Sequence, residues 1–252
     1  MLITTQGLVL REVSYKESDK ILTVLTRDLG KRTVKARGCR KKSSPLAASA
    51  QLLVWSDMTL FEYRDHLTLN EGSSLEQFWG VREDIEKLAL GSYFAEAAEA
   101  VAEEGVPNPG LLSLVLNSLY VLDKLHKPLA LVKAAFELKL LCLSGYEPLL
   151  DACAVCGAAE PDEPRLNLSE GVLHCARCRS GVGDGVSMPL DRGSLAAMRH
   201  VACGDPKRLF SFSVGPESLR LLEGACEAFL MTQLERGFRT LDFYKQLRRP
   251  QD

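Results

Sequence analysis

The sequence lacks the long apolar runs that membrane insertion and secretion require. No apolar segment follows a basic start near residue 1, so we expect no signal peptide. The most apolar stretch, residues 129–143, is interrupted by Lys133, Glu137 and Lys139, whereas a membrane span needs about 18 or more largely uncharged residues. We therefore expect a cytoplasmic protein that does not associate with membranes.

Motifs that would indicate an enzyme are missing as well. The sequence holds only four histidines, and none stands in a recognisable relation to a nucleophile. It contains no G-x-x-x-x-G-K-[ST] loop, so we do not expect ATP hydrolysis. These absences predict a protein that is not an enzyme.

Net charge is small, but the charges are separated along the chain. The formal net charge is −2, yet residues 27–42 carry eight basic side chains against one acid. Residues 83–104 carry seven acids against one base. The acidic segment is most simply the solvated face of a helix, and the alternative is a docking surface for a basic partner.

The first part of the chain consists of short segments that resemble strands. Aliphatic and β-branched residues, separated by turn residues, predict strands at residues 7–15, 20–28, 31–39, 52–63 and 67–72. Five strands with short loops in so small a region favour a closed sheet, because closure removes unpaired edges. We predict a five-stranded OB-type nucleic-acid-binding barrel over residues 1–80.

Apolar residues recur at helical spacing after Trp79. The pattern predicts helices from Ile85, at residues 112–125 and 129–143, and again near residues 190–201 and 216–236. The predicted fold is therefore an α+β multidomain protein. In it, an all-α domain of two parts, residues 81–149 and 188–252, is interrupted by a four-cysteine zinc-binding module at residues 150–187.

The four cysteines of this module form the most specific motif in the chain. Cys153, Cys156, Cys175 and Cys178 follow the pattern C-x2-C-x18-C-x2-C, which is typical of four-cysteine zinc sites. Each C-x-x-C turn points two sulfurs at one ion, and two turns complete a tetrahedron of thiolates. Because a closed site of this kind is structural, we predict one structural Zn²⁺ ion.

Other uses of these cysteines stay open. Redox or disulfide chemistry, an iron–sulfur cluster and a catalytic metal are alternatives, and His174 could replace one cysteine ligand. A zinc deaminase would need H-x-E and P-C-x-x-C, and neither occurs. The segment contains few apolar residues, so we expect burial alone not to order it, whereas structural zinc contributes on the order of 10 kcal/mol.

The basic segment supplies candidates for DNA binding. Strand alternation places Lys31, Lys35 and Arg37 on one face and Arg32 on the other. Binding of a phosphate backbone needs several cations in a row, although lysines can also simply protect an edge strand from aggregation. The predicted DNA-binding residues are Lys31, Arg32, Lys35, Arg37, Arg40, Lys41 and Lys42.

Three aromatic residues of the predicted barrel share one face of a strand. Trp55, Phe61 and Tyr63 occupy odd positions, so their side chains point the same way. The interpretation that we favour places them in the barrel core. The alternative is a platform on which bases stack.

The order of several motifs resembles the RecO family of bacterial recombination mediators. The segment GLVLREVSYKESDKILTVLTRDLGKRTVKARGCRKKSSPLA is similar to the opening of that family. The segment QLERGFRTLDFYKQL is similar to its closing part, and the cysteine module lies where many members carry one. The resemblance covers essentially the whole chain.

The resemblance implies an activity and partners that the residues alone do not indicate. It implies binding of single- and double-stranded DNA, annealing of complementary strands, and help in loading the RecA recombinase onto strands coated by single-strand-binding protein. The implied partners are RecR and the acidic, aromatic-ended C-terminal tail of single-strand-binding protein. Lys133 and Lys139 are candidates for contacting that tail, and a nucleoid-associated location follows from the activity.

Two hypotheses from other classes compete with a DNA-binding mediator. One is a zinc-containing nucleic-acid enzyme such as a nuclease, which would cleave the strands that it binds. The other is an interaction adaptor that does not bind DNA.

Overall fold

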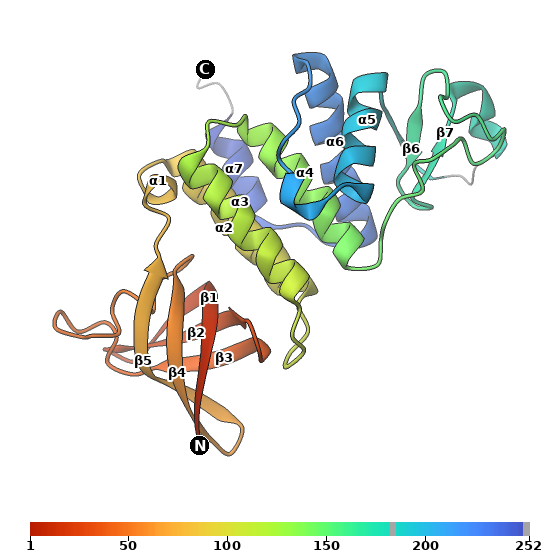
Figure 1. Ribbon diagram of the computed structural model, residues 1–252. Coiled ribbons are helices and arrows are strands. Elements are labelled where there is room, and N and C mark those ends of the chain that lie inside the picture. The colour runs from red at the N-terminus through yellow and green to blue at the C-terminus, as the bar shows by residue number, and fades with distance from the viewer. Residues whose placement is uncertain (182–184, 249–252) are drawn as a thin grey trace. The chain divides into compact units, whose positions relative to one another are not determined.

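The structure is a computed structural model that describes residues 1–181 and 185–248 (Figure 1). The described chain divides into two compact units. The first unit joins Met1–Leu125 to the C-terminal segment that begins at Phe238, and the second unit is His126–Gly237. Residues 182–184 of the predicted zinc module and residues 249–252 of the predicted helical domain lie outside the described residues.

A closed five-stranded barrel forms the N-terminal part of the first unit. Its sheet order is β1-β2-β3-β5-β4, and β1 pairs with β4 to close it. All neighbours are antiparallel except β3 and β5, which is the arrangement of an OB fold and confirms the predicted barrel. The strands are β1 (Leu2–Tyr15), β2 (Asp19–Thr26), β3 (Gly30–Ala36), β4 (Trp55–Tyr63) and β5 (His66–Glu76).

Alternation along the strands separates the barrel core from its outer face. On β3 the side chains of Val34 and Ala36 are buried, whereas Thr33 on the strand and Arg37 directly after it are exposed. Apolar residues without aromatic rings fill the interior because a five-stranded barrel leaves little room inside. The core includes Val9, Leu22, Val24, Val34, Ala36, Met58, Leu60, Leu67 and Leu69.

Four helices complete the first unit. They are α1 (Trp79–Arg82), α2 (Ile85–Val101), α3 (Pro109–Lys124) and α7 (Arg239–Leu247). The Asp84 side chain caps α2 by accepting from the N–H groups of Glu86 and Lys87, and Asn108 caps α3. The last helix, α7, packs against α2 although most of the chain separates them, and Figure 1 shows it behind α2 and α3.

The second unit is built on three helices and a small sheet. The helices are α4 (Leu129–Leu143), α5 (Arg192–Cys203) and α6 (Pro216–Gln233), with 3₁₀ turns η1 (Ala176–Gly181) and η2 (Pro206–Arg208). The sheet has the order β7-β6-β8 and comprises β6 (Arg165–Asn167), β7 (Val172–His174) and β8 (Ser187–Pro189). No helix among the described residues combines the length and apolar character that a bilayer crossing would take.

The cysteine segment has more apolar packing than its composition indicates. Leu166, Leu168 and Leu173 are buried; Leu166 lies on β6, Leu173 lies on β7, and Leu168 directly follows β6. These leucines give the segment a small apolar core of its own, and the expectation that burial alone does not order it stays a prediction.

Candidate nucleic-acid interface and metal centre

A groove of about 970 Å³ runs over the outer face of the barrel. It lies beside the turn between β1 and β2 and the turn between β4 and β5, which are the loops that flank oligonucleotides on OB folds. Cations and aromatic rings share its lining. The principal side chains are Tyr15, Arg32, Lys35, Arg37, Phe61 and Tyr63.

Strand register explains why these side chains meet. Lys35 on β3 is paired with Thr68 on β5, and Thr68 is paired with Phe61 on β4. The three residues therefore form one row across the outer face of the sheet. A base stacked on Phe61 would lie in the same row as the ammonium of Lys35.

The aromatic side chains of β4 lie outside the barrel. Phe61 is 46% exposed and Tyr63 is 59% exposed, whereas Met58 and Leu60, which precede them on the strand, are buried. The interpretation that Phe61 and Tyr63 fill the core is therefore wrong, because the even-numbered residues face inward. Trp55 is partly buried at the start of β4 and does not line the groove.

The predicted DNA-binding cations differ in their surroundings. Lys35 lies 3.5 Å from the Asp19 carboxylate and 4.8 Å from the centroid of the Tyr15 ring. Lys31 turns away and donates to the backbone carbonyl of Glu99 at 2.9 Å. Arg32 lines the groove despite its position on the opposite strand face. The exposed cations that follow are Arg37, Arg40, Lys41 and Lys42.

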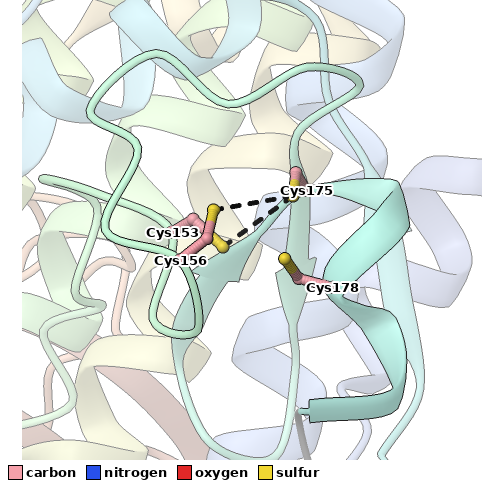
Figure 2. A group of neighbouring side chains, drawn as sticks. All are labelled: Cys153, Cys156, Cys175 and Cys178. Carbon is pink, nitrogen blue, oxygen red and sulfur yellow. Dashed lines mark hydrogen bonds between the residues drawn. The ribbon is translucent and has the colours of Figure 1, made fainter.

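The four cysteines of the second unit come together in space (Figure 2). Their sulfurs all lie within 4.8 Å of one another, and the Sγ of Cys175 is 4.0 Å from that of Cys153 and 3.9 Å from that of Cys156. Each C-x-x-C closes a tight turn, in which the N–H of Gly157 donates to Cys153 and that of Cys178 to Cys175. The arrangement fits one metal ion held by four thiolates.

The electrostatics of this cluster favour a thiolate at Cys153, whereas the side-chain contact with Cys175 and burial raise the pKa of Cys178 to about 12. Burial opposes ionisation of Cys153, but backbone N–H groups, led by that of Cys156, outweigh it and lower its pKa to about 6. A thiolate at neutral pH is the form that ligates metals. Four cysteine ligands leave no open position, so the donor set is that of a structural site.

Comparison with known proteins decides the family. The family model described as "Recombination protein O N terminal" matches residues 1–78, and the one described as "Recombination protein O C terminal" matches residues 82–242. The chain is 32% identical over 248 residues to the DNA repair protein RecO of Acetivibrio thermocellus and covers 98% of both chains. The chain belongs to the RecO family.

Further RecO proteins show the same relationship. The chain is 32% identical over 248 residues to the DNA repair protein RecO of Alkaliphilus metalliredigens, covering 98% of this chain and 100% of the relative. It is 33% identical over 224 residues to that of a Listeria monocytogenes strain, covering 89% and 86%. The relationship therefore includes both the barrel and the unit that carries the cysteines.

His174 of this RecO chain is a structural residue. It is buried, one ring nitrogen lies 3.1 Å from the Cys175 carbonyl oxygen, and the other lies 2.9 Å from the Ser187 hydroxyl. Both nitrogens are thus engaged away from the sulfurs. The idea that His174 replaces a cysteine ligand is wrong for this structure.

Arg199 on α5 holds the first cysteine turn in place, and the sequence pattern does not indicate this role. Its guanidinium donates to the backbone carbonyls of Leu150, Asp151 and Ala159, and it pairs with the Glu160 carboxylate at 2.8 Å. One side chain therefore fixes both flanks of the Cys153 turn. Such a clamp is recognisable only after folding because 39 or more residues separate the partners.

Arg64 is a second residue that sequence reasoning misses. It lies in the turn between β4 and β5, and its guanidinium carbon is 5.2 Å from the centroid of the Tyr63 ring. Lys16 has the same relation to Tyr15 in the other turn, at 5.6 Å. The only available signal is that a cation adjoins an aromatic residue in each turn, which is common in proteins of any function.

Several acids of the segment 83–104 bind within the first unit. Glu99 forms a bidentate pair with Arg11 on β1, with Nε–O distances of 2.9 and 3.0 Å. Glu96 accepts from the N–H of Thr240 at 3.0 Å and so caps α7. The expectation of a solvated helix face is wrong for these residues, because the carboxylates join the helices to each other and to the barrel.

Lys133 is buried in the second unit. Its ammonium lies 2.9 Å from Glu137 and 2.8 Å from Glu227 on α6. Burial opposes the charge, but the two carboxylates outweigh it and raise the pKa of Lys133 above its ordinary value. The prediction that Lys133 contacts an external acidic tail is therefore wrong. Lys139 is half-buried and donates to the Ala202 carbonyl at 3.0 Å.

Proposed function

We propose that this RecO family member is a DNA-binding recombination mediator that acts in DNA repair. It binds single- and double-stranded DNA, anneals complementary single strands and helps to load the RecA recombinase onto strands coated by single-strand-binding protein. The observation that supports DNA binding best is the groove in which Phe61 and Tyr63 lie beside Lys35 and Arg37. The finer activities follow from the family resemblance.

The groove provides the two interactions that single strands use. Exposed rings offer faces on which successive bases stack, at about 1–3 kcal/mol per base, and this stacking tolerates any sequence. Cations of β3 and its exit loop pair with phosphates and release counterions. The proposed DNA contacts are Lys35, Arg37, Arg40, Lys41 and Lys42, joined by Tyr15, Phe61 and Tyr63. Of the other predicted cations, Arg32 lines the groove, and the ammonium of Lys31 is held by the Glu99 carbonyl.

A charge-reversal experiment tests this surface. Lys35→Glu combined with Arg37→Glu should lower DNA affinity at least tenfold for every sequence and flatten the salt dependence of binding, because two phosphate contacts are lost. Lys207→Glu combined with Arg208→Glu is the matched control, since these cations are exposed in the second unit. If the folded groove variant and the control bound DNA with equal affinity, the proposed DNA-binding surface would be contradicted.

Two assays separate the mediator from its alternatives. Faster annealing of complementary strands covered by single-strand-binding protein supports the mediator. Strand cleavage under the same conditions would favour the nuclease hypothesis. If the protein did not bind DNA at low salt, the hypothesis of an interaction adaptor would remain. RecR and the C-terminal tail of single-strand-binding protein are the proposed partners, and the proposed location is the nucleoid.

We also propose that Cys153, Cys156, Cys175 and Cys178 hold one structural Zn²⁺ ion. The ion would cross-link the Cys153–Cys156 turn to the Cys175–Cys178 turn and so stabilise the small sheet that joins them. Metal analysis should give one zinc per chain, and a chelator should remove hydrogen-exchange protection from residues 150–178 while α4 stays protected. Iron in the purified protein, or unchanged protection after zinc removal, would contradict the assignment.

A further inference from the structure

The charges of the groove are unevenly distributed. Arg37 and the cations of the exit loop stand at the end of β3, whereas two carboxylates, Asp65 and Glu104, line the groove elsewhere. We propose that Asp65 and Glu104 close one end of the DNA path and direct a single strand out over the opposite, basic end. This inference rests on the proposed DNA binding and adds the direction of the strand.

Backbone pairing places Glu104 at the beginning of β3. Glu104 forms a parallel bridge with Lys31, and the N–H of Gly105 donates to the Lys31 carbonyl at 3.1 Å. The linker between α2 and α3 thus lies along the first residues of the strand. This close approach requires glycine at position 30, because its φ is +66° and a Cβ there would overlap the Val106 carbonyl oxygen.

Strand pairing places Asp65 at the same end. β3 and β5 run parallel, with Val34 opposite Leu67, and Asp65 precedes Leu67 by two residues. It therefore lies near the level of Arg32, which precedes Val34 by two residues. The guanidinium of Arg32 is also close to the linker, since its Nη1 is 3.7 Å from the Cβ position at Gly105.

Arg32 therefore shares its end of the groove with two carboxylates, and the guanidinium of Arg64, beside Asp65 in the turn, lies over the Tyr63 ring. The negative charge of the two carboxylates offsets that of the Arg32 guanidinium and repels phosphates within a Debye length, which is about 10 Å at 0.1 M salt. Lys31 adds little there because its ammonium is turned to the Glu99 carbonyl. At the other end, Arg37 is followed by Arg40, Lys41 and Lys42 in the exposed exit loop.

The test removes the two charges without changing side-chain shape. Asp65→Asn with Glu104→Gln should bind oligothymidylate about threefold to tenfold more tightly at low salt, and the gain should disappear at about 1 M salt. Asparagine tolerates the φ of +62° at position 65. The matched control is Glu71→Gln with Glu103→Gln, because both side chains are exposed and neither lines the groove.

A second measurement identifies the end of the path. In the wild-type protein Arg32→Ala should change affinity by less than about twofold, whereas Arg37→Ala should lower it about fivefold or more. In the Asp65→Asn, Glu104→Gln background, Arg32→Ala should lower affinity about as much as Arg37→Ala. If Asp65 and Glu104 close this end of the DNA path, Arg32 should contribute to affinity only after their charges have been removed.

Three outcomes would overturn the inference while leaving DNA binding intact. These are an unchanged affinity of the charge-neutral variant, an equal gain in the control pair, and a wild-type loss at Arg32 as large as that at Arg37. Failure of the proposed function looks different, because the wild-type protein would then show no salt-dependent binding to oligothymidylate at all.

Discussion

The ammonium of Lys35 lies 4.8 Å from the centroid of the Tyr15 ring, at a distance typical of a cation–π contact. The same nitrogen lies 3.5 Å from Asp19. In the free protein the Lys35 ammonium therefore covers the face of the Tyr15 ring on which a base would stack. A phosphate offers Lys35 another partner, so we infer that backbone binding and stacking on Tyr15 occur together.

Stacking makes Phe61 a sensitive position. Phe61→Ala should weaken binding of single-stranded DNA by about 1–3 kcal/mol while leaving the free energy of unfolding nearly unchanged, because the ring is exposed. Fluorescence titration with oligothymidylate measures the loss. Tyr120→Ala on α3 is the control, since that ring is also exposed but does not line the groove. A similar loss in both variants would argue against stacking at Phe61.

Asp19 should contribute to the acid stability of the barrel. Its carboxylate accepts from the N–H of Gly38, which lowers its pKa below 3.8 against the effect of burial, with help from Lys35. Because the folded pKa is lowered, this stabilisation is present above pH 3.8 and is lost as the pH falls through the lowered pKa. Asp19→Asn should lower the urea midpoint at neutral pH.

The pH dependence distinguishes this effect from simple loss of packing. The difference in midpoint between Asp19→Asn and the wild-type protein should shrink as the pH falls below about 4, whereas Glu71→Gln should show little difference at any pH. A difference that stays constant down to pH 2 or so would contradict the role of the Asp19 charge.

Arg199 should control how firmly the cysteine turn retains the proposed zinc ion. Arg199→Ala frees the backbone at Leu150 and Ala159, so a chromophoric chelator should extract zinc about tenfold faster. Arg199→Lys should give an intermediate rate, because one ammonium cannot reproduce the fork of donors. The control is Arg220→Ala on α6, where Arg220 pairs with Glu217 one turn away. The chelator should extract zinc from this variant at the wild-type rate. Equal rates in all variants would contradict the clamp.

The buried cation of α4 should be indispensable for the second unit. Lys133→Met leaves the carboxylates of Glu137 and Glu227 without their ammonium, which should cost about 3–5 kcal/mol in the free energy of unfolding. Lys139→Met removes only one hydrogen bond to a carbonyl and should cost about 1 kcal/mol. Urea denaturation measures both, and equal costs would show that the buried pairs contribute little.

Local patterns in the sequence predict much of the fold. Pro128 and Gly145 delimit a helix at residues 129–143, and the structure has α4 over Leu129–Leu143. Alternation on the basic strand correctly separates Val34 and Ala36 from Lys35 and Arg37. Cysteine spacing predicts the cluster because each C-x-x-C turn is a local structure. These features depend on residues close together in the chain.

The remaining features depend on contacts that no local pattern contains. Alternation shows that Phe61 and Tyr63 share a face, but only the small interior of the barrel decides that this face is outside. The contact between Glu96 and Thr240 joins positions 144 residues apart. Glu104 reaches β3 through a linker whose own sequence carries no strand signal. The meeting of Asp65 and Glu104 in one groove is therefore visible only in three dimensions.

The placement of α7 has a consequence for synthesis of the protein. The ring of Phe238 packs edge-on against that of Tyr93 at 5.5 Å, yet the whole second unit lies between them in the sequence. During synthesis on a ribosome, Tyr93 and the surface of α2 around it therefore stay exposed until α7 has been synthesised. The second unit can fold during that interval, so the part of the protein made first is the last to be completed.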